Sequence, residues 1–379
     1  MRRALGEAPL ERVEHVESDQ WTVAGSFRRH APLYKAVFAD DAGTELYVSG
    51  VTGQVVQDTT RYERFWNWLG AVPHWLYFKA LRERPELWSD VVIYASLLGT
   101  FLTVTGIYVG IRMYGRGKRK SPFRGVALWH HWTGLIFGLF TLTWVFSGLA
   151  SMQPWGWLVS EGPGRELSAL AGRPMDGADA EMLVQGLAAN PQFGVVSAEL
   201  SIQRGEPYAI LVRADGSRFR ASLPDLAPAP LSDGELAALA PAARPGAPVK
   251  SAGLIAEPDA YHYGHHRAVI LPAWRIIYGD AGETRLYLDP ATGELIGFAD
   301  APARAFRWWH SGLHSLDVGA LRNRPLWDVV VLPLMIGVSL LCLIGVWMGI
   351  RRLRWRSSAS ARGARRKARK RQQPPAPPA

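Results

Sequence analysis

Three stretches of the chain are long and apolar enough to cross a bilayer, which takes roughly 20 apolar residues. They are Trp88–Ile111, Val126–Met152 and Leu326–Ile350. The third contains Pro333, which a membrane helix tolerates where neighbouring helices satisfy the lost hydrogen bond. The pattern therefore predicts an α-helical membrane protein with three transmembrane helices.

The segments between these stretches alternate polar and apolar positions, as strands do. Tyr34–Val56 and Trp274–Phe298 each read as alternation, a turn and alternation again, which predicts two β-hairpins. Ala178–Ala189 is amphipathic and Tyr208–Arg213 is strand-like, which indicates a small α+β domain. We interpret the Ala- and Pro-rich stretch Leu226–Pro248 as a linker or loop.

The chain contains an internal repeat. Residues 34–85 match residues 274–325 at a constant step of 240, and one residue later Gly106–Arg112 matches Gly345–Arg351. Each copy runs from a strand-like module, past a histidine, into an apolar segment, so the protein is an internal duplication. By this symmetry we expect a helix resembling Val126–Met152 to precede residue 1.

The net charge of +10 is concentrated beside the apolar segments. Six Lys or Arg lie in 112–124 and eleven in 351–371, with no Asp or Glu in either stretch. Basic flanks of this kind mark the cytoplasmic side of a membrane and contact anionic lipid, so they give no indication of nucleic-acid binding. The predicted topology places 1–87 and 153–325 outside the cytoplasm, and 112–125 and the basic, Pro-rich tail 351–379 inside.

Cys342 is the only cysteine and falls inside the third apolar stretch. One cysteine excludes intramolecular disulfides, iron–sulfur clusters and the Cys-x-x-Cys-His attachment of c-type haem. No Gly-x-Gly-x-x-Gly follows a predicted strand, so we expect no nicotinamide or flavin domain.

Five histidines lie near the ends of the apolar stretches, and such residues are functional candidates. Adjacent residues on a helix point about 100° apart, so His130 and His131 cannot both face one partner. Residues four apart share a helix face, so His310 and His314 cannot bind opposite sides of one haem iron. The five are His74, His130, His131, His310 and His314.

The repeat supplies a candidate pair, because the step of 240 maps His74 onto His314. If the two copies pack around a pseudo-two-fold axis, these side chains could meet across it as ligands of one haem iron. On the inner side, His131 or His130 would need a partner from the helix expected before residue 1. The alternative is that these histidines bond to backbone groups or lipid headgroups.

Several arginines lie at the outer membrane face, where the positive-inside rule disfavours basic residues. Such residues need a counter-anion: haem propionates, an anionic substrate, phospholipid, or a nearby carboxylate. The arginines are Arg82, Arg84, Arg322 and Arg324, and the nearby carboxylates are Glu83 and Glu86.

The segment Tyr261–Arg267 carries three histidines, and imidazole suits zinc, copper and iron. No carboxylate or cysteine follows at a matching spacing. We therefore expect this loop to pack on the domain or on the membrane surface rather than to bind a metal.

Each apolar stretch contains Gly-x-x-x-Gly, a spacing that lets membrane helices approach closely. The pairs are Gly106/Gly110, Gly134/Gly138 and Gly345/Gly349.

Three motifs together resemble the PepSY-associated transmembrane family, which includes iron-regulated inner-membrane proteins of bacteria. They are Trp-His-His-Trp-Thr-Gly-Leu-Ile-Phe-Gly-Leu-Phe (129–140), Gly-Leu-His-Ser-Leu-Asp (312–317) and Tyr-x-Asp-Pro-x-Thr-Gly (287–293). The resemblance covers nearly the whole chain apart from the basic tail. It implies four transmembrane helices, PepSY modules on the periplasmic side, and a cytoplasmic C-terminus.

Some members of this family resemble b-haem reductases that pass electrons outward to ferric siderophores. The resemblance therefore implies haem b, with His74 and His314 as outer iron ligands and His131 or His130 as an inner one. It also implies a ferric-chelate substrate and a cytoplasmic or quinol electron donor. This chain departs from the family pattern because it lacks the first helix and that helix's histidine motif.

Two other functions remain open from the sequence. The protein could be a non-enzymatic PepSY protein that binds a peptide or protease, with the apolar stretches as an anchor. It could also be a permease component for iron or its chelate, although the middle of the apolar stretches carries no charged residue.

Overall fold

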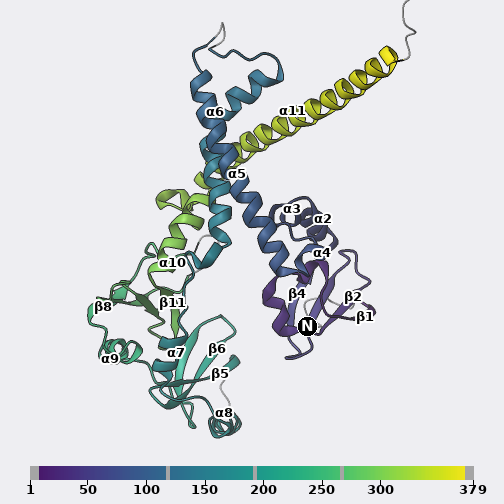
Figure 1. Ribbon diagram of the computed structural model, residues 1–379. Coiled ribbons are helices and arrows are strands. Elements are labelled where there is room, and N and C mark those ends of the chain that lie inside the picture. The colour runs from purple at the N-terminus through teal and green to yellow at the C-terminus, as the bar shows by residue number, and fades with distance from the viewer. Residues whose placement is uncertain (1–7, 117–119, 191–193, 265–268, 372–379) are drawn as a thin grey trace, which may run out of the picture. The chain divides into compact units, whose positions relative to one another are not determined.

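The computed structural model describes residues 8–116, 120–190, 194–264 and 269–371, with 355–371 as backbone only. Contacts divide the chain into two compact units, Met1–Leu102 and Thr103–Ala379 (Figure 1). Each unit is described by itself.

Three of the described helices are long and apolar enough to cross a membrane. They are α5 (Pro85–Met113), α6 (Val126–Ser151) and α11 (Leu326–Arg371). The prediction of three such helices is confirmed. Pro333 lies within α11, and this helix continues through the basic tail beyond the predicted end at Ile350.

The first unit contains a four-stranded antiparallel sheet in sequence order. Its strands are β1 (Leu10–Val16), β2 (Leu33–Phe38), β3 (Glu45–Ser49) and β4 (Val55–Thr59). The short turns η1 (Gln20–Thr22) and η2 (Gly25–His30) connect β1 to β2. After β4 come α2 (Arg61–Leu69), α3 (Ala71–Trp75) and α4 (Lys79–Arg82), which lead into α5. Leu33 and Tyr47 are fully buried in this unit.

The second unit contains an equivalent sheet, with strands in the order β11-β10-β9-β8. They are β8 (Val249–Ile255), β9 (Ala273–Tyr278), β10 (Arg285–Leu288) and β11 (Leu295–Ala299). The chain then forms α10 (Ala301–Phe306), the π-helical turn η4 (Arg307–Gly312) and η5 (Gly319–Arg322), and enters α11.

The internal repeat is confirmed at the level of strands and turns. Strands β2 and β4 correspond to β9 and β11 at the step of 240, and both sheets carry a register shift at the same point, after Tyr47 and after Tyr287. Asp40 accepts a hydrogen bond from the backbone N–H of Thr44 at 2.6 Å, and Asp280 from that of Thr284 at 2.8 Å. Both predicted hairpins are present.

The repeat begins earlier than the sequence comparison indicated. Strand β1 pairs with β2 as β8 pairs with β9, with register shifts at Leu10/Arg12 and at Val249/Ser251. The sequences of β1 and β8 differ almost everywhere, so pattern matching missed them. Each is an outermost strand with one mostly exposed face, which places little constraint on its side chains.

An additional three-stranded antiparallel sheet belongs to the second unit alone. Strands β5 (Val195–Gln203), β6 (Glu206–Arg213) and β7 (Arg218–Ser222) pair in sequence order. Helix α8 (Gly177–Ala189) packs Leu183 and Leu187 against their buried cluster. The predicted helix at Ala178–Ala189 and strand at Tyr208–Arg213 are confirmed. The remaining elements are η3 (Pro154–Gly156) and α7 (Gly164–Ala171).

The interpretation of Leu226–Pro248 as a linker or loop is wrong. This stretch contains helix α9 (Asp233–Ala243), in which Ser232 and Glu235 form a reciprocal capping box. Its buried residues pack on β9 and β10. Composition hid the helix, because Ala and Pro are abundant there, but the Ser-x-x-Glu signature marks its start. The residues that α9 contributes to the core are Leu236, Leu239, Ala240 and Ala243.

Candidate functional site

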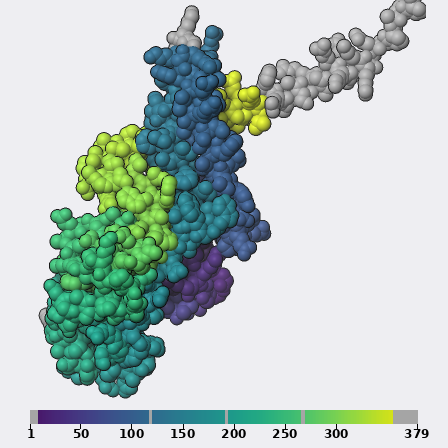
Figure 2. All heavy atoms as spheres, turned by 60° about the vertical axis from the view of Figure 1, so that its left-hand side comes forward, coloured from purple at the N-terminus to yellow at the C-terminus, as the bar shows by residue number. Residues whose placement is uncertain are grey.

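Two of the predicted histidines lie together at one end of α6. In the second unit, the α10–η4 segment lies beside α6 (Figures 1 and 2). The rings of His310 and His314 stack with centroids 5.2 Å apart and planes at 27°. The predicted shared face of these two residues is therefore present.

Ser147 of α6 contacts both of these rings. The Nδ1 atom of His310 lies 3.1 Å from the backbone oxygen of Ser147, and Nδ1 of His314 lies 3.0 Å from its Oγ. A carbonyl only accepts, so His310 donates from Nδ1. The Ser147 hydroxyl donates to the Trp144 carbonyl at 3.0 Å, so it accepts from His314.

This network assigns the same tautomer to both histidines, with the proton on Nδ1 and the lone pair on Nε2. Burial lowers the pKa of His310, which favours its neutral form. A neutral imidazole whose second nitrogen is fixed by a carbonyl or hydroxyl is the arrangement that metal-ligating histidines adopt. Ser147 was missed by the sequence analysis, because its sequence neighbours give no sign of a contact 167 residues away.

His131 has a different environment. It is buried, its Nε2 lies 2.8 Å from the carbonyl oxygen of Gly110, and its Nδ1 lies 2.8 Å from the hydroxyl of Ser121. The carbonyl requires a proton on Nε2, so Nδ1 accepts from the Ser121 hydroxyl. Both ring nitrogens are therefore occupied by protein groups. Iron ligation by His131 stays a prediction, and it requires one of these contacts to break.

His130 points to a different helix, as the predicted angle of about 100° requires. Its ring lies against Gly345 of α11, where an added Cβ would come within 3.3 Å of Cε1. Its Nδ1 is buried without a hydrogen-bond partner among the described residues.

His74 lies in the first unit, at the end of α3. Its ring is exposed and makes an edge-to-face contact with Trp75, with centroids 5.4 Å apart. His74 and His314 belong to the two units that are described separately, so their pairing stays a prediction.

Arg322 already has a counter-ion. Its Nε lies 3.1 Å from Oδ1 of Asp317, and its guanidinium stacks on the ring of Tyr263 at 4.2 Å. Arg307 stacks on the same ring at 4.6 Å and donates to the backbone oxygen of Asp317. Burial and a hydrogen bond to Asp317 raise the pKa of Tyr263 to about 12, so this phenol stays neutral.

Arg82 is the repeat mate of Arg322 but has a different environment. It is 7% exposed and stacks on the rings of Tyr77, at 4.8 Å, and Trp88, at 4.0 Å. The residue in the place of Asp317 is Tyr77, and Nε of Arg82 has no hydrogen-bond partner within the described ranges. Burial lowers the pKa of Arg82, the signature of a poorly solvated cation. Of the two candidate arginines, Arg82 is the one with an unbalanced charge.

The described part of the loop Tyr261–Arg267 packs as expected. His262 is buried, stacks on Tyr287 with centroids 4.7 Å apart, and bonds through Nε2 to the Ile270 oxygen at 3.0 Å. His265, His266 and Arg267 lie outside the described residues. Among the described residues, no three metal-ligating side chains lie close enough to hold an ion.

A repeated polar cluster anchors this loop, and the sequence analysis missed it. Asp259 accepts hydrogen bonds from the backbone of Tyr261 and His262, from the Tyr287 hydroxyl and from Arg275. The step of 240 maps Asp259, Arg275 and Tyr287 onto Asp19, Lys35 and Tyr47. Lys35 bonds Asp19 at 3.2 Å, and Asp19 accepts from the backbone of Trp21. Extending the repeat toward the N-terminus would have found the cluster.

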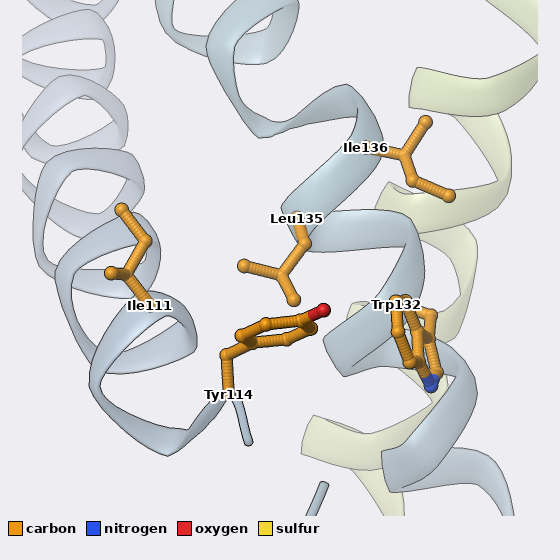
Figure 3. Close-up of a pocket in the computed structure, with 5 residues that line it drawn as sticks. All are labelled: Ile111, Tyr114, Trp132, Leu135 and Ile136. Atoms are coloured by element: carbon orange, nitrogen blue, oxygen red, sulfur yellow. The ribbon is translucent and has the colours of Figure 1, made fainter. Parts of the chain in front are cut away.

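A shallow apolar pocket of about 290 Å³ lies between the ends of α5 and α6. Figure 3 shows Tyr114 reaching from α5 toward Leu135 and Trp132 of α6. Ile111 and Ile136 complete the lining. None of these five side chains ligates iron, so the pocket adds no candidate ligand.

A comparison with protein-family models finds no match for this chain, and a comparison with curated proteins finds none either. The resemblance to PepSY-associated membrane proteins is therefore a proposal that rests on the three quoted motifs.

Proposed function

We propose that this chain is a PepSY-associated protein of the bacterial inner membrane that binds haem b and passes electrons outward to a ferric siderophore or another metal complex. The observation that carries the proposal is the pair His310 and His314, whose Nδ1 atoms both bond to Ser147. This arrangement presents the Nε2 lone pairs and suits iron ligation. A bound b-type haem supplies reversible one-electron chemistry.

The residues of the chain have separate roles in this proposal. His314 ligates the iron, and Ser147 fixes the tautomer and orientation of its ring. His310 shares a face with His314, so it cannot supply the opposite ligand, which we assign to His74. Arg82 binds an anionic group such as a propionate. For His131 the geometry does not fit iron ligation, since both nitrogens are bonded, and we propose no step through an inner haem there.

The test is the reduced-minus-oxidised absorbance spectrum of the purified full chain. We expect b-type bands in the parent protein, and His314→Ala should remove or shift them because the ligand is lost. Ser147→Ala should leave the bands present but shift the reduction potential, because the ring loses its orienting bond. The matched control is His15→Ala, an exposed histidine of β1, which should change neither. Absence of b-type bands in the parent protein sinks the proposal.

One observation favours a second candidate, a PepSY protein that binds a peptide without catalysis. Strands β1 and β8 each pair on one side only and lie at an edge of their sheets. Exposed edge strands can accept an extended peptide as an additional strand. This candidate gains if the spectrum shows no haem while the sheets bind a peptide.

A further inference from the structure

A basic pocket lies at the opposite end of α6 from the histidines. It has a volume of about 520 Å³ and lies between the start of α6 and α11. Ligand sites of small molecules have volumes of about 300–1,000 Å³, so the pocket is large enough for a headgroup. Its lining combines two kinds of residue: the arginines Arg124, Arg351 and Arg352, and an apolar wall of Val126, Ala127, Trp347 and Met348, with Gly125 between them.

The charge of this pocket is not neutralised by its own helix ends. All three arginines are exposed, and neither 112–125 nor 351–371 contains an Asp or Glu. Three guanidinium groups from two different helix ends therefore surround one cavity. Guanidinium groups bind phosphate through paired N–H···O hydrogen bonds, so the chemistry selects a phosphate-bearing anion.

The apolar wall decides which phosphate compound fits. Val126 begins α6, and Trp347 and Met348 lie one turn before Arg351 on α11, so apolar and basic residues meet where the apolar helices end. Tryptophan at this depth is typical of the boundary between headgroups and acyl chains. A free phosphate would contact the arginines and leave the apolar wall in water, whereas a phospholipid contacts both.

We propose that this pocket binds the phosphate of one anionic phospholipid of the inner leaflet, with its glycerol and upper acyl carbons against Trp347 and Met348. The positive-inside pattern would then serve two purposes: the tail beyond Arg354 interacts with the membrane surface in general, and the pocket holds one lipid. The inference rests on the membrane placement in the proposed function and does not depend on haem.

The site requires a specific backbone conformation at Gly125. This residue precedes α6 with φ of +58°, in the region that disfavours side chains. It lies in the pocket lining beside Arg124. A larger residue at 125 would strain the turn that brings Arg124 to the start of α6.

The test is the number of phosphatidylglycerol molecules that the full chain retains after purification in mild detergent, counted by native mass spectrometry. We expect the parent protein to retain one, and the triple variant Arg124→Gln, Arg351→Gln, Arg352→Gln to weaken its retention by roughly tenfold or more. The charge-matched control Arg365→Gln, Arg366→Gln, Lys367→Gln removes three charges from the tail and should change retention less than about twofold.

Two further arms keep the outcome decisive. The variant with lysine at 124, 351 and 352 keeps the charge, so it should retain the lipid and shows that loss in the Gln variant is not misfolding. Inorganic phosphate in excess should not displace the lipid, and displacement would identify free phosphate as the ligand and overturn the proposal. Equal losses in the pocket and tail variants would also overturn it, since they indicate general surface attraction. The haem spectrum of the same samples separates this result from a failure of the proposed function.

Discussion

At the scale of single residues, hydrogen-bond donors and acceptors decide what each histidine can do. Ser147 directs two rings to present Nε2, whereas Gly110 and Ser121 occupy both nitrogens of His131. All three residues look alike in the sequence, as histidines near the end of an apolar stretch. Their chemistry differs because their neighbours come from other helices.

The residue scale also yields a stability prediction for the repeated polar cluster. Burial opposes ionisation of Asp259, but hydrogen bonds from the backbone of Tyr261 and His262 and from Tyr287 and Arg275 lower its pKa overall. A lowered folded-state pKa gives stability that is present above the unfolded value, near 3.9, and is lost as pH falls through the folded value.

Asp259→Asn should therefore lower the free energy of unfolding by about 1–3 kcal/mol at neutral pH. The difference from the parent protein should shrink in acid, where Asp259 becomes protonated. Thermal unfolding of the full chain in detergent at several pH values measures this. Asp41→Asn, at an exposed position, is the control. A loss that is the same at every pH would contradict the assigned role of the carboxylate.

At the scale of elements, glycines set how closely the apolar helices pack. Of the six glycines in the predicted motifs, Gly110, Gly134, Gly138 and Gly345 face a neighbouring helix, whereas Gly106 and Gly349 have nothing within 4 Å. The closest contact is at Gly337, which the motif search missed. A Cβ there would lie 2.3 Å from the ring of Phe137. The sequence motif identifies helices that pack, but the contact face depends on their crossing.

Gly337→Ala should accordingly destabilise the packing of α6 and α11, by about 1–3 kcal/mol, because the methyl group overlaps a ring in a packed interface. Gly349→Ala is the matched control, since it adds the same methyl group to the same helix where space is open. Detergent-dependent unfolding followed by tryptophan fluorescence compares the two. Equal effects would show that helix propensity, rather than the Phe137 contact, controls the outcome.

At the scale of the whole molecule, charge and hydropathy agree on a topology. The three apolar helices are flanked by acid-free basic segments at 112–125 and 351–371, and the sheets lie in the remaining segments. Three spans with these flanks place the sheets on the side opposite the basic segments.

Thiol labelling tests this topology in a Cys342→Ser background. A cysteine introduced at Ala180, exposed on α8, should react with a membrane-impermeant reagent in spheroplasts. A cysteine introduced at Ser357, in the basic tail, should react only after the membrane is opened. Labelling of Ser357→Cys in sealed spheroplasts would reverse the orientation and with it the inner-leaflet site.

The sequence alone determined the three apolar helices, both hairpins and the duplication, because hydrophobic length, alternation and internal similarity are local properties of the chain. It also determined that His130 and His131 face different partners, since this follows from helix geometry. It did not reveal α9, whose burial depends on the sheet it covers, or strands β1 and β8, whose repeat is carried by pairing rather than by residue identity. Only the tertiary structure decided the state of each histidine and the contrast between Arg322 and Arg82. Those properties depend on Ser147, Gly110 and Asp317, and only folding brings the first two beside their histidines.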